Sequence, residues 1–161
     1  MPEVKYAMKS RTGRDNQRCY GPKGERLVAG VVPLSPDKTK VLLIQSSSRK
    51  GWVLPKGGWE KDEATAAAAA KREAWEEGGI IVRVEKDLGV ILDTRPTTPS
   101  TNNNNPKVIY QFFEAVVTEQ RSEWPEKAKR ERKWFTFAEA SELFAQRSEL
   151  LEALKRSGCK K

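Results

Sequence analysis

The feature that most constrains this chain is an alanine-rich stretch at residues 62–77, which reads DEATAAAAAKREAWEE. Alanine has the highest helix propensity of all residues, and five alanines follow one another at residues 66–70. Asp62 is a suitable N-cap, and Gly78 followed by Gly79 is a typical helix stop. We therefore predict a helix at residues 62–77, around which the rest of the chain packs.

Apolar, β-branched runs before and after this helix predict strands. They lie at residues 27–32, 41–44, 52–54, 80–84, 88–92, 108–117 and 133–137. Residues 138–155 carry leucines and Phe144 at helical spacing, which predicts one final helix that packs on the sheet. The segment 55–58, Pro-Lys-Gly-Gly, reads as a loop. Strands and helices mixed without strict alternation predict an α/β or α+β sandwich.

The chain of 161 residues has the length of one domain, and we expect residues 1–161 to form it. Residues 94–106 contain three prolines and four consecutive asparagines, which predicts a flexible loop. The net charge of +8 lies at the two ends, including a basic N-terminal segment at residues 1–24, while residues 27–120 are neutral. Such an excess either attracts an anionic partner or serves solubility, and charge alone leaves both interpretations open.

The composition excludes several classes of chemistry. The chain has no histidine, so it cannot use an imidazole base or an imidazole-based zinc site. Its two cysteines cannot build the disulfide framework of a small secreted domain. No apolar run reaches the roughly 18 residues of a membrane span, and the first residues do not resemble a signal peptide. We expect a cytoplasmic or nuclear protein that does not bind membranes.

Three glutamates occupy the end of the predicted helix. Glu73, Glu76 and Glu77 stand at i, i+3 and i+4, so they project from one helical face. Arg72 can pair with Glu76, which leaves Glu73 and Glu77 facing each other. Such a run is usually a solvated face, but clustered carboxylates beside a glycine-rich loop also suit Mg²⁺ or Mn²⁺ for phosphate chemistry.

At these residues the chain resembles the Nudix hydrolase family. The positions that match the family's sequence box are Gly58, Arg72-Glu73-Ala74, Glu76-Glu77, Gly79 and Ile80. Ala64 stands where the box counted from Gly58 has a glutamate, and Glu63 fits only a count from Gly57, which puts the loop geometry in doubt. The resemblance implies a Nudix α/β/α sandwich with a mixed sheet between helices.

The resemblance also implies roles for residues around the helix. Metal ions would be held by Glu73, Glu76, Glu77 and the backbone carbonyl of Lys56, and Glu76 or Glu77 would act as the catalytic base. Short strings at residues 26–30, 46–49, 52–58 and 133–135 look like fungal diphosphoinositol polyphosphate phosphohydrolases. That branch also cleaves diadenosine polyphosphates and inorganic polyphosphate. The residues that would contact phosphates by position are Arg11, Arg26, Ser47, Arg49, Lys56, Gly57, Gly58, Arg130 and Arg147.

The expected partner is therefore a small, highly anionic substrate, with Mg²⁺ as cofactor and Mn²⁺ as a substitute. We expect a monomer with no obligatory nucleic acid. One alternative is a nucleotide or RNA-cap pyrophosphatase, which needs an aromatic stacking partner such as Trp59, Trp75 or Tyr110. Another is a non-catalytic basic module that binds nucleic acid or inositol phosphates, and it predicts disrupted metal ligands.

Overall fold

The computed structural model describes residues 6–11, 25–48, 50–92 and 108–161, and these form seven strands and three helices. The strands are β1 (Arg26–Leu34), β2 (Val41–Gln45), β3 (Trp52–Val53), β4 (Lys56–Gly58), β5 (Ile80–Leu92), β6 (Val108–Gln120) and β7 (Arg132–Phe135). The helices are α1 (Ala66–Gly78), α2 (Phe137–Leu143) and α3 (Ser148–Arg156). The predicted loop at residues 94–106 and the side chain of Arg49 lie outside the described residues.

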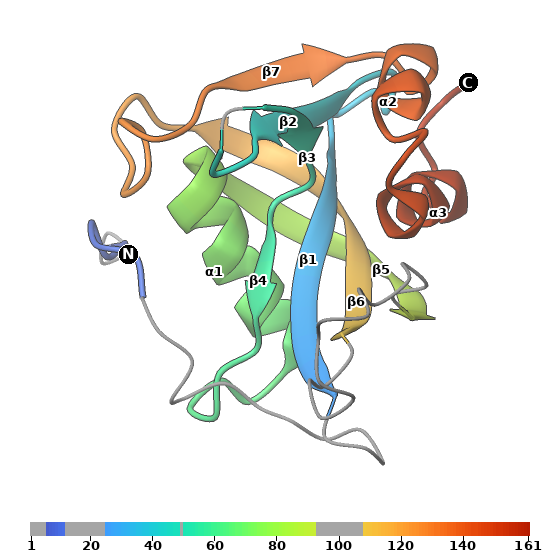
Figure 1. The fold of residues 1–161 in the computed structure, drawn as a ribbon. Coiled ribbons are helices and arrows are strands. Elements are labelled where there is room, and N and C mark those ends of the chain that lie inside the picture. The colour runs from blue at the N-terminus through green and yellow to red at the C-terminus, as the bar shows by residue number, and fades with distance from the viewer. Residues whose placement is uncertain (1–5, 12–24, 49, 93–107) are drawn as a thin grey trace.

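The strands join into one mixed sheet. Its path runs β3-β2-β1-β6-β5, with β4 paired to β1 and β7 paired to β2. β1 and β6 run parallel, from Arg26 opposite Val108 to Leu34 opposite Val116, and the remaining pairs are antiparallel. α1 lies on one side of the sheet, and α2 and α3 lie on the other (Figure 1). The predicted sandwich with a mixed sheet between helices is confirmed.

β1 runs through the middle of the hydrophobic core. Its seven residues from Val28 to Leu34 are all buried. A strand with only one covered face alternates between buried and exposed side chains, so continuous burial requires cover on both faces. α1 supplies that cover on one side, and side chains such as Phe112, Leu150 and Leu154 are fully buried elsewhere in the same core. The sheet is therefore a rigid support for whatever α1 presents at its end.

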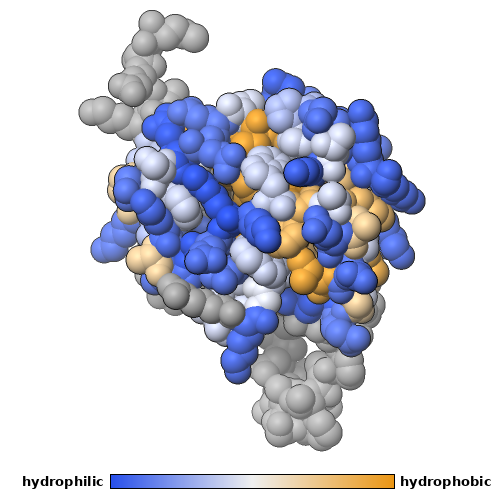
Figure 2. Space-filling view, turned by 90° about the horizontal axis from the view of Figure 1, so that it is seen from above, coloured by the Kyte–Doolittle hydropathy of each residue, from blue (hydrophilic) through white to orange (hydrophobic). Residues whose placement is uncertain are grey.

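The face of the molecule seen from above carries mainly polar and charged side chains (Figure 2). Viewed from above, hydrophilic side chains dominate, and the apolar areas between them are smaller and interrupted (Figure 2). Among the helices of the described residues, none has both the length and the apolar character needed to cross a membrane.

α1 begins later than the sequence predicted. Its N-cap is Thr65, whose hydroxyl accepts a hydrogen bond from the backbone N–H of Ala68, so the prediction of Asp62 as N-cap is wrong. The preceding residues form a turn in which the N–H of Glu63 donates to the carbonyl of Glu60. The predicted stop is confirmed, because Gly79 adopts the left-handed conformation at φ 63° that glycine tolerates best.

Two predicted segments differ from the structure near the site. β5 is one strand where two runs were expected, and shifts in its register against β6 absorb the irregular residues between them. The expected loop at residues 55–58 contains β4, where Lys56 pairs opposite Gly30 of β1. Backbone pairing does not depend on side chains, so the two glycines of β4 can join the sheet and still leave room for α1.

The predicted final helix is two helices, α2 and α3, separated by residues 144–147. Phe144 and Leu150 are both fully buried. Six residues along a straight helix rotate a side chain by about 600°, which would set these two about 120° apart. The break lets both side chains enter the core, which explains why the helical spacing alone was misleading.

Candidate active site

The three glutamates of α1 are buried, Glu73 and Glu77 against β4 and Glu76 beneath residues 6–11. Glu73, Glu76 and Glu77 are 7%, 4% and 8% exposed. Glu73 sits directly against Gly57, where a Cβ atom would collide with its carboxylate. Position 57 therefore needs glycine for the helix to approach the strand. Because all three side chains are buried, these glutamates do not form a solvated helix face.

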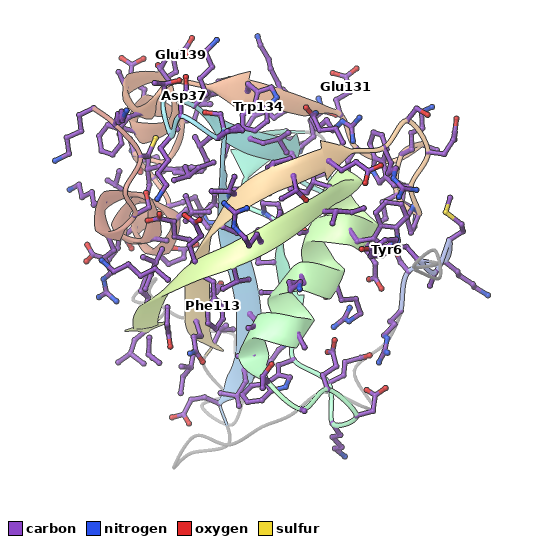
Figure 3. The ribbon with its side chains drawn as sticks, turned by 180° about the vertical axis from the view of Figure 1, so that it is seen from behind. Tyr6, Asp37, Phe113, Glu131, Trp134 and Glu139 are labelled. Atoms are coloured by element: carbon purple, nitrogen blue, oxygen red, sulfur yellow. The ribbon has the colours of Figure 1, made fainter. Side chains whose placement is uncertain are left out.

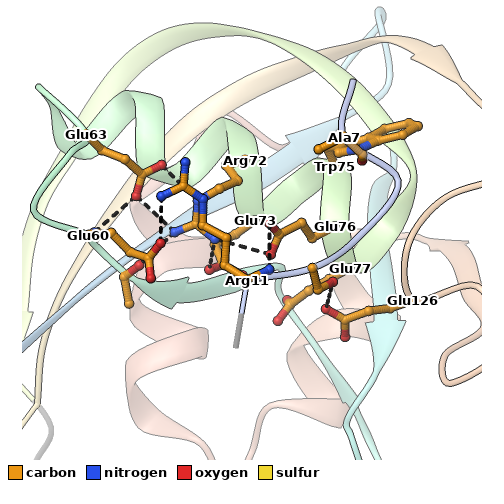
Figure 4. Close-up of polar contacts among 12 residues, drawn as sticks. Ala7, Arg11, Glu60, Glu63, Arg72, Glu73, Trp75, Glu76, Glu77 and Glu126 are labelled. Carbon is orange, nitrogen blue, oxygen red and sulfur yellow. Dashed lines mark hydrogen bonds and ion pairs between the residues drawn. The ribbon is translucent and has the colours of Figure 1, made fainter. Parts of the chain in front are cut away.

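Arg72 lies at the centre of this cluster and contacts several of its carboxylates (Figure 4). Its guanidinium donates to Glu63 at 2.8 and 2.9 Å, to Glu73 at 2.8 Å and to Glu76 at 3.2 Å. It also donates to the carbonyl oxygen of Gly58 at 2.9 Å. The predicted Arg72–Glu76 pair is present, but the expectation that Glu73 lacks a basic partner is wrong.

Glu63 compensates for the absence of a glutamate at position 64, where the chain has Ala64. Both of its carboxylate oxygens accept hydrogen bonds from Arg72, and Oε1 also accepts from the backbone N–H of Glu60 at 3.0 Å. These contacts tie the loop after β4 to α1 beside Glu73 and Glu76. The doubt about loop geometry is resolved, since the neighbouring residue Glu63 makes the connection that Ala64 cannot make.

Glu77 faces the opposite side of the cluster. Its Oε1 accepts a hydrogen bond from the backbone N–H of Lys56 at 3.0 Å, and its Oε2 contacts Arg130 at 3.4 Å. Its backbone carbonyl accepts from the indole N–H of Trp124 at 3.2 Å. Arg132 stacks on that indole and donates to the carbonyl oxygen of Gly78, which satisfies the end of the helix.

Glu126 is a fourth carboxylate that the sequence did not reveal. Its backbone N–H donates to the carbonyl oxygen of Glu76 at 3.1 Å, which places it beside the end of α1. Its carboxylate accepts from Arg130 Nε at 2.8 Å and from Ser10 Oγ at 2.7 Å. No local spacing pattern marks this residue, because the contacts depend on how residues 121–131 fold against the helix.

Burial makes these carboxylates costly to ionise. Burial, together with the neighbouring Glu77, raises the pKa of Glu73 to about 8 against the opposing effect of Arg72. Burial likewise raises the pKa of Glu77 to about 7, although Arg130 and Lys56 oppose the shift. The pKa of Glu76 is also raised by burial. Additional positive charge nearby would favour the ionised form of these carboxylates.

A divalent cation fits the chemistry of this cluster. Two guanidinium groups, those of Arg72 and Arg130, contact five carboxylates, which are Glu63, Glu73, Glu76, Glu77 and Glu126. The carboxylates outnumber the guanidinium groups, and negatively charged oxygen atoms are the ligands that Mg²⁺ and Mn²⁺ prefer. In the described part of the chain, no three such side chains converge closely enough to hold an ion as they stand. Metal binding would therefore require the arginines to release some of these oxygens.

Three of the predicted phosphate ligands gather beside Glu77. Burial lowers the pKa of the Lys56 ammonium group, and the positive charges of Arg147 and Arg130 lower it further. The negative charges of Glu77 and Glu149 raise it. All four groups are therefore close enough to Lys56 to affect its charge. Arg147 Nε donates to the fully buried carboxylate of Glu149 at 2.6 Å. Lys56, Arg130 and Arg147 thus form a cationic region next to the carboxylate cluster.

Gly57 and Gly58 follow Lys56 in β4, but Arg11, Arg26 and Ser47 lie outside this region. Arg11 donates to Glu60 at 2.7 Å and to Asp62 at 2.8 Å, and these hydrogen bonds raise its pKa, Asp62 contributing most. Arg26 starts β1, four residues from Gly30, which pairs with Lys56, so it lies about 13 Å along the strand. Ser47 is exposed in the turn after β2. The structure therefore does not bring all the predicted ligands into one pocket.

The aromatic candidates already have partners. Trp75 is buried, donates its indole N–H to the carbonyl of Ala7 at 2.6 Å and contacts the ring of Tyr6. Tyr110 stacks on Phe112 inside the core, at 5.8 Å between ring centroids. Trp59 donates its indole N–H to the carbonyl of Glu63. Trp75 also borders a pocket, which is described below.

Comparison with known proteins adds the following matches. A family model described as NUDIX domain matches residues 24–155. Nudix hydrolase 21, chloroplastic, of Arabidopsis thaliana is 40% identical over 161 residues, covering 95% of this chain and 76% of that protein. Diphosphoinositol polyphosphate phosphohydrolase 3-alpha of Homo sapiens is 30% identical over 149 residues, covering 88% and 85%. A solved NUDIX hydrolase from Nitrosomonas europaea shares the fold, with TM-score 0.67, 19% identity and coverage of 82% and 87%.

Proposed function

The chain belongs to the Nudix hydrolase family, and from this premise we propose that it is a Mg²⁺-dependent hydrolase of diphosphoinositol polyphosphates. Diadenosine polyphosphates and inorganic polyphosphate are the further substrates we propose. The observation that carries the proposal is the cationic region of Lys56, Arg130 and Arg147 directly beside Glu77. A substrate with many phosphates needs several basic side chains next to the place where one anhydride bond is cut.

Glu73, Glu76 and Glu77 would hold Mg²⁺, with the backbone carbonyl of Lys56 as a further ligand. When bound, Mg²⁺ supplies a Lewis acid and lowers the pKa of a coordinated water. Either Glu76 or Glu77 would accept the proton of the attacking water. Mn²⁺ has the same preference for oxygen ligands and could replace Mg²⁺.

The surrounding residues would bind and orient the substrate. Arg130 and Arg147 can make bidentate hydrogen bonds to phosphate oxygens, and the ammonium group of Lys56 adds a point charge. Glu63 fixes Arg72, which in turn orients Glu73 and Glu76. Gly57 and Gly58 would let the substrate approach the backbone of β4. Arg26, Ser47 and Arg49 stay predictions as contacts to the outer phosphates.

The non-catalytic module loses support because the three glutamates it predicted to be disrupted are present and buried. Of the aromatic residues that an RNA-cap hydrolase could use for stacking, Trp59 and Tyr110 are engaged within the fold, and Trp75 stays a candidate. We also propose a monomer located in the cytoplasm or nucleus. Light scattering tests whether the protein is a monomer. Imaging of a tagged protein tests its location, for which the names of two Arabidopsis relatives instead indicate chloroplasts and mitochondria.

The direct test compares three substrates at equal Mg²⁺ concentration: a diphosphoinositol polyphosphate, a diadenosine polyphosphate and capped RNA. We expect the highest kcat/KM for the diphosphoinositol polyphosphate and no turnover after chelation of the metal. Preference for capped RNA, or turnover without metal, would contradict the proposal. A phosphate-release assay with chromatographic identification of the products provides both readings.

A further inference from the structure

Residues 6–11, here called the strap, cross the outer face of α1 beside the carboxylate cluster (Figure 4). The strap is held at several points. The carbonyl of Ala7 accepts from Trp75, the hydroxyl of Ser10 donates to Glu126, and the backbone N–H of Arg11 lies 3.3 Å from Glu76 Oε2. Tyr6 lies at the end of α1 when seen from behind (Figure 3), with Arg121 over its ring.

Between the strap, α1 and the start of β5 lies a pocket of about 420 Å³. This volume is within the range that small-molecule sites occupy. Its apolar lining includes Tyr6 and Trp75, whose ring centroids are 5.2 Å apart, together with Ile80 and Val82. A wall of two aromatic rings and branched aliphatic side chains suits a flat, apolar group better than a hydrated inositol ring.

The polar lining of the pocket is positively charged. Arg72 is paired with Glu63 and Glu76, and the two arginines of the lining, Arg11 and Arg72, balance these two glutamates in formal charge. Lys9 and Lys71 also line the pocket, and both are exposed. Within the described residues neither ammonium group makes an ion pair. Two uncompensated cations at the mouth of an aromatic pocket favour an anion.

We propose that this pocket binds a planar aromatic ring that carries one phosphate group, a nucleoside monophosphate being the simplest ligand of that kind. The ring contacts Tyr6 and Trp75, and the phosphate lies near Lys9 and Lys71. The site is separate from the cationic region at Lys56, and it binds a ligand that contains no anhydride bond to cleave. Because the strap also contacts Glu76, a bound ligand holds the strap beside the carboxylates.

Isothermal titration of the metal-free protein with AMP tests the proposal. We expect saturable binding, at least tenfold weaker for adenosine or ribose 5-phosphate, because each lacks one of the two groups. Ribose 5-phosphate binding as tightly as AMP would overturn the proposal, since the aromatic lining would then contribute nothing. Absence of any AMP binding up to several millimolar would overturn it as well.

Matched variants locate the ligand. The double change Lys9→Ala with Lys71→Ala should weaken AMP at least fivefold, while Lys86→Ala with Lys155→Ala removes the same charge from exposed positions outside the pocket lining and should leave it unchanged. If both double variants lost AMP affinity equally, the loss would be due to net charge alone, and the proposed site would be refuted.

Two further variants separate this pocket from the proposed catalytic region. Tyr6→Ala should weaken AMP, and Tyr6→Phe, which keeps the ring, should not. Arg130→Ala should leave AMP binding intact, since Arg130 contacts Glu77 and Glu126 outside the pocket. If Arg130→Ala abolished AMP binding while the lysine pair had no effect, AMP would lie in the phosphate region, and the pocket proposal would be wrong whatever the enzyme hydrolyses.

Discussion

The two sides of the carboxylate cluster hold their basic residues differently. On the Glu77 side, Arg130 is only 12% exposed and lies with Lys56 and Arg147 against the end of α1. On the Glu60 side, Arg11 is 40% exposed and bound to Glu60 and Asp62. On both sides the arginine is bound to carboxylates, but the first side brings three basic residues together near Glu77, whereas on the second side Arg11 bridges Glu60 and Asp62. The difference teaches that a basic residue near the site is not automatically available to a substrate.

The largest expected effect tests the carboxylates between the two sides. Glu77→Gln keeps the size of the side chain but removes the charge, so we expect kcat to fall at least 100-fold, about 2.7 kcal/mol in activation free energy. The fold should persist, because a neutral amide relieves the repulsion with Glu73. Steady-state kinetics and circular dichroism measure the two outcomes. Activity within tenfold of wild type would end the assignment of Glu77 as a metal ligand.

The next effect compares the two sides directly. Arg130→Ala should lower kcat/KM for a diphosphoinositol polyphosphate roughly 30-fold, about 2 kcal/mol, because it removes a buried cation beside the cleaved bond. Arg11→Ala should cost less than about fivefold, since the Arg11 side chain is 40% exposed and its charge is screened by solvent. If Arg11→Ala proved the more damaging change, Arg11 would have to leave its acidic partners for the substrate, and the contrast between the sides would fail.

A stability effect is expected where the loop after β4 meets α1. Glu63→Ala leaves the half-buried Arg72 without its bidentate partner, so we expect a loss of about 2 kcal/mol in the free energy of unfolding. Chemical denaturation measures it. Ala64→Glu is the matched control: it restores the family pattern by count, and it should give no gain because Glu63 already fills the role. Stabilisation by Ala64→Glu would show that Glu63 is an imperfect substitute.

The last expected effect is on the pH dependence of stability. The pKa of Glu73 rises from 4.5 to about 8 on folding, and that of Glu77 rises to about 7. Between the unfolded and folded values the native state binds more protons, so stability must fall as the pH rises from about 5 to about 8. Melting temperatures of the metal-free protein should show this slope, and Glu73→Gln should flatten it. A melting temperature that rose across this window would contradict the burial of these charges.

The parts that sequence could predict are those with a local pattern. The alanine run placed α1, the double glycine placed its end, and the i, i+3, i+4 spacing of Glu73, Glu76 and Glu77 located the cluster. The choice between Asp62 and Thr65 as N-cap could not be made, because both side chains are good caps and the turn before the helix decided it.

The parts that sequence could not predict depend on distant contacts. Glu126 reaches the site only because Trp124 and Arg132 anchor its loop to the end of α1, about fifty residues earlier in the chain. The contact between Ser10 and Glu126 joins residues 116 positions apart. No spacing rule links such residues, so neither the strap nor its pocket was visible before the structure.

The measurement that tests the central claim most directly is the ratio of two kcat/KM values, one for a diphosphoinositol polyphosphate and one for a diadenosine polyphosphate, in wild type and in Arg130→Ala. The proposed account predicts that the ratio falls about tenfold in the variant, because the substrate with more phosphates depends more on the cationic region. Added salt should lower the wild-type ratio in the same direction. An unchanged ratio, with both substrates losing equally, would contradict the account and leave a Nudix hydrolase whose specificity lies elsewhere.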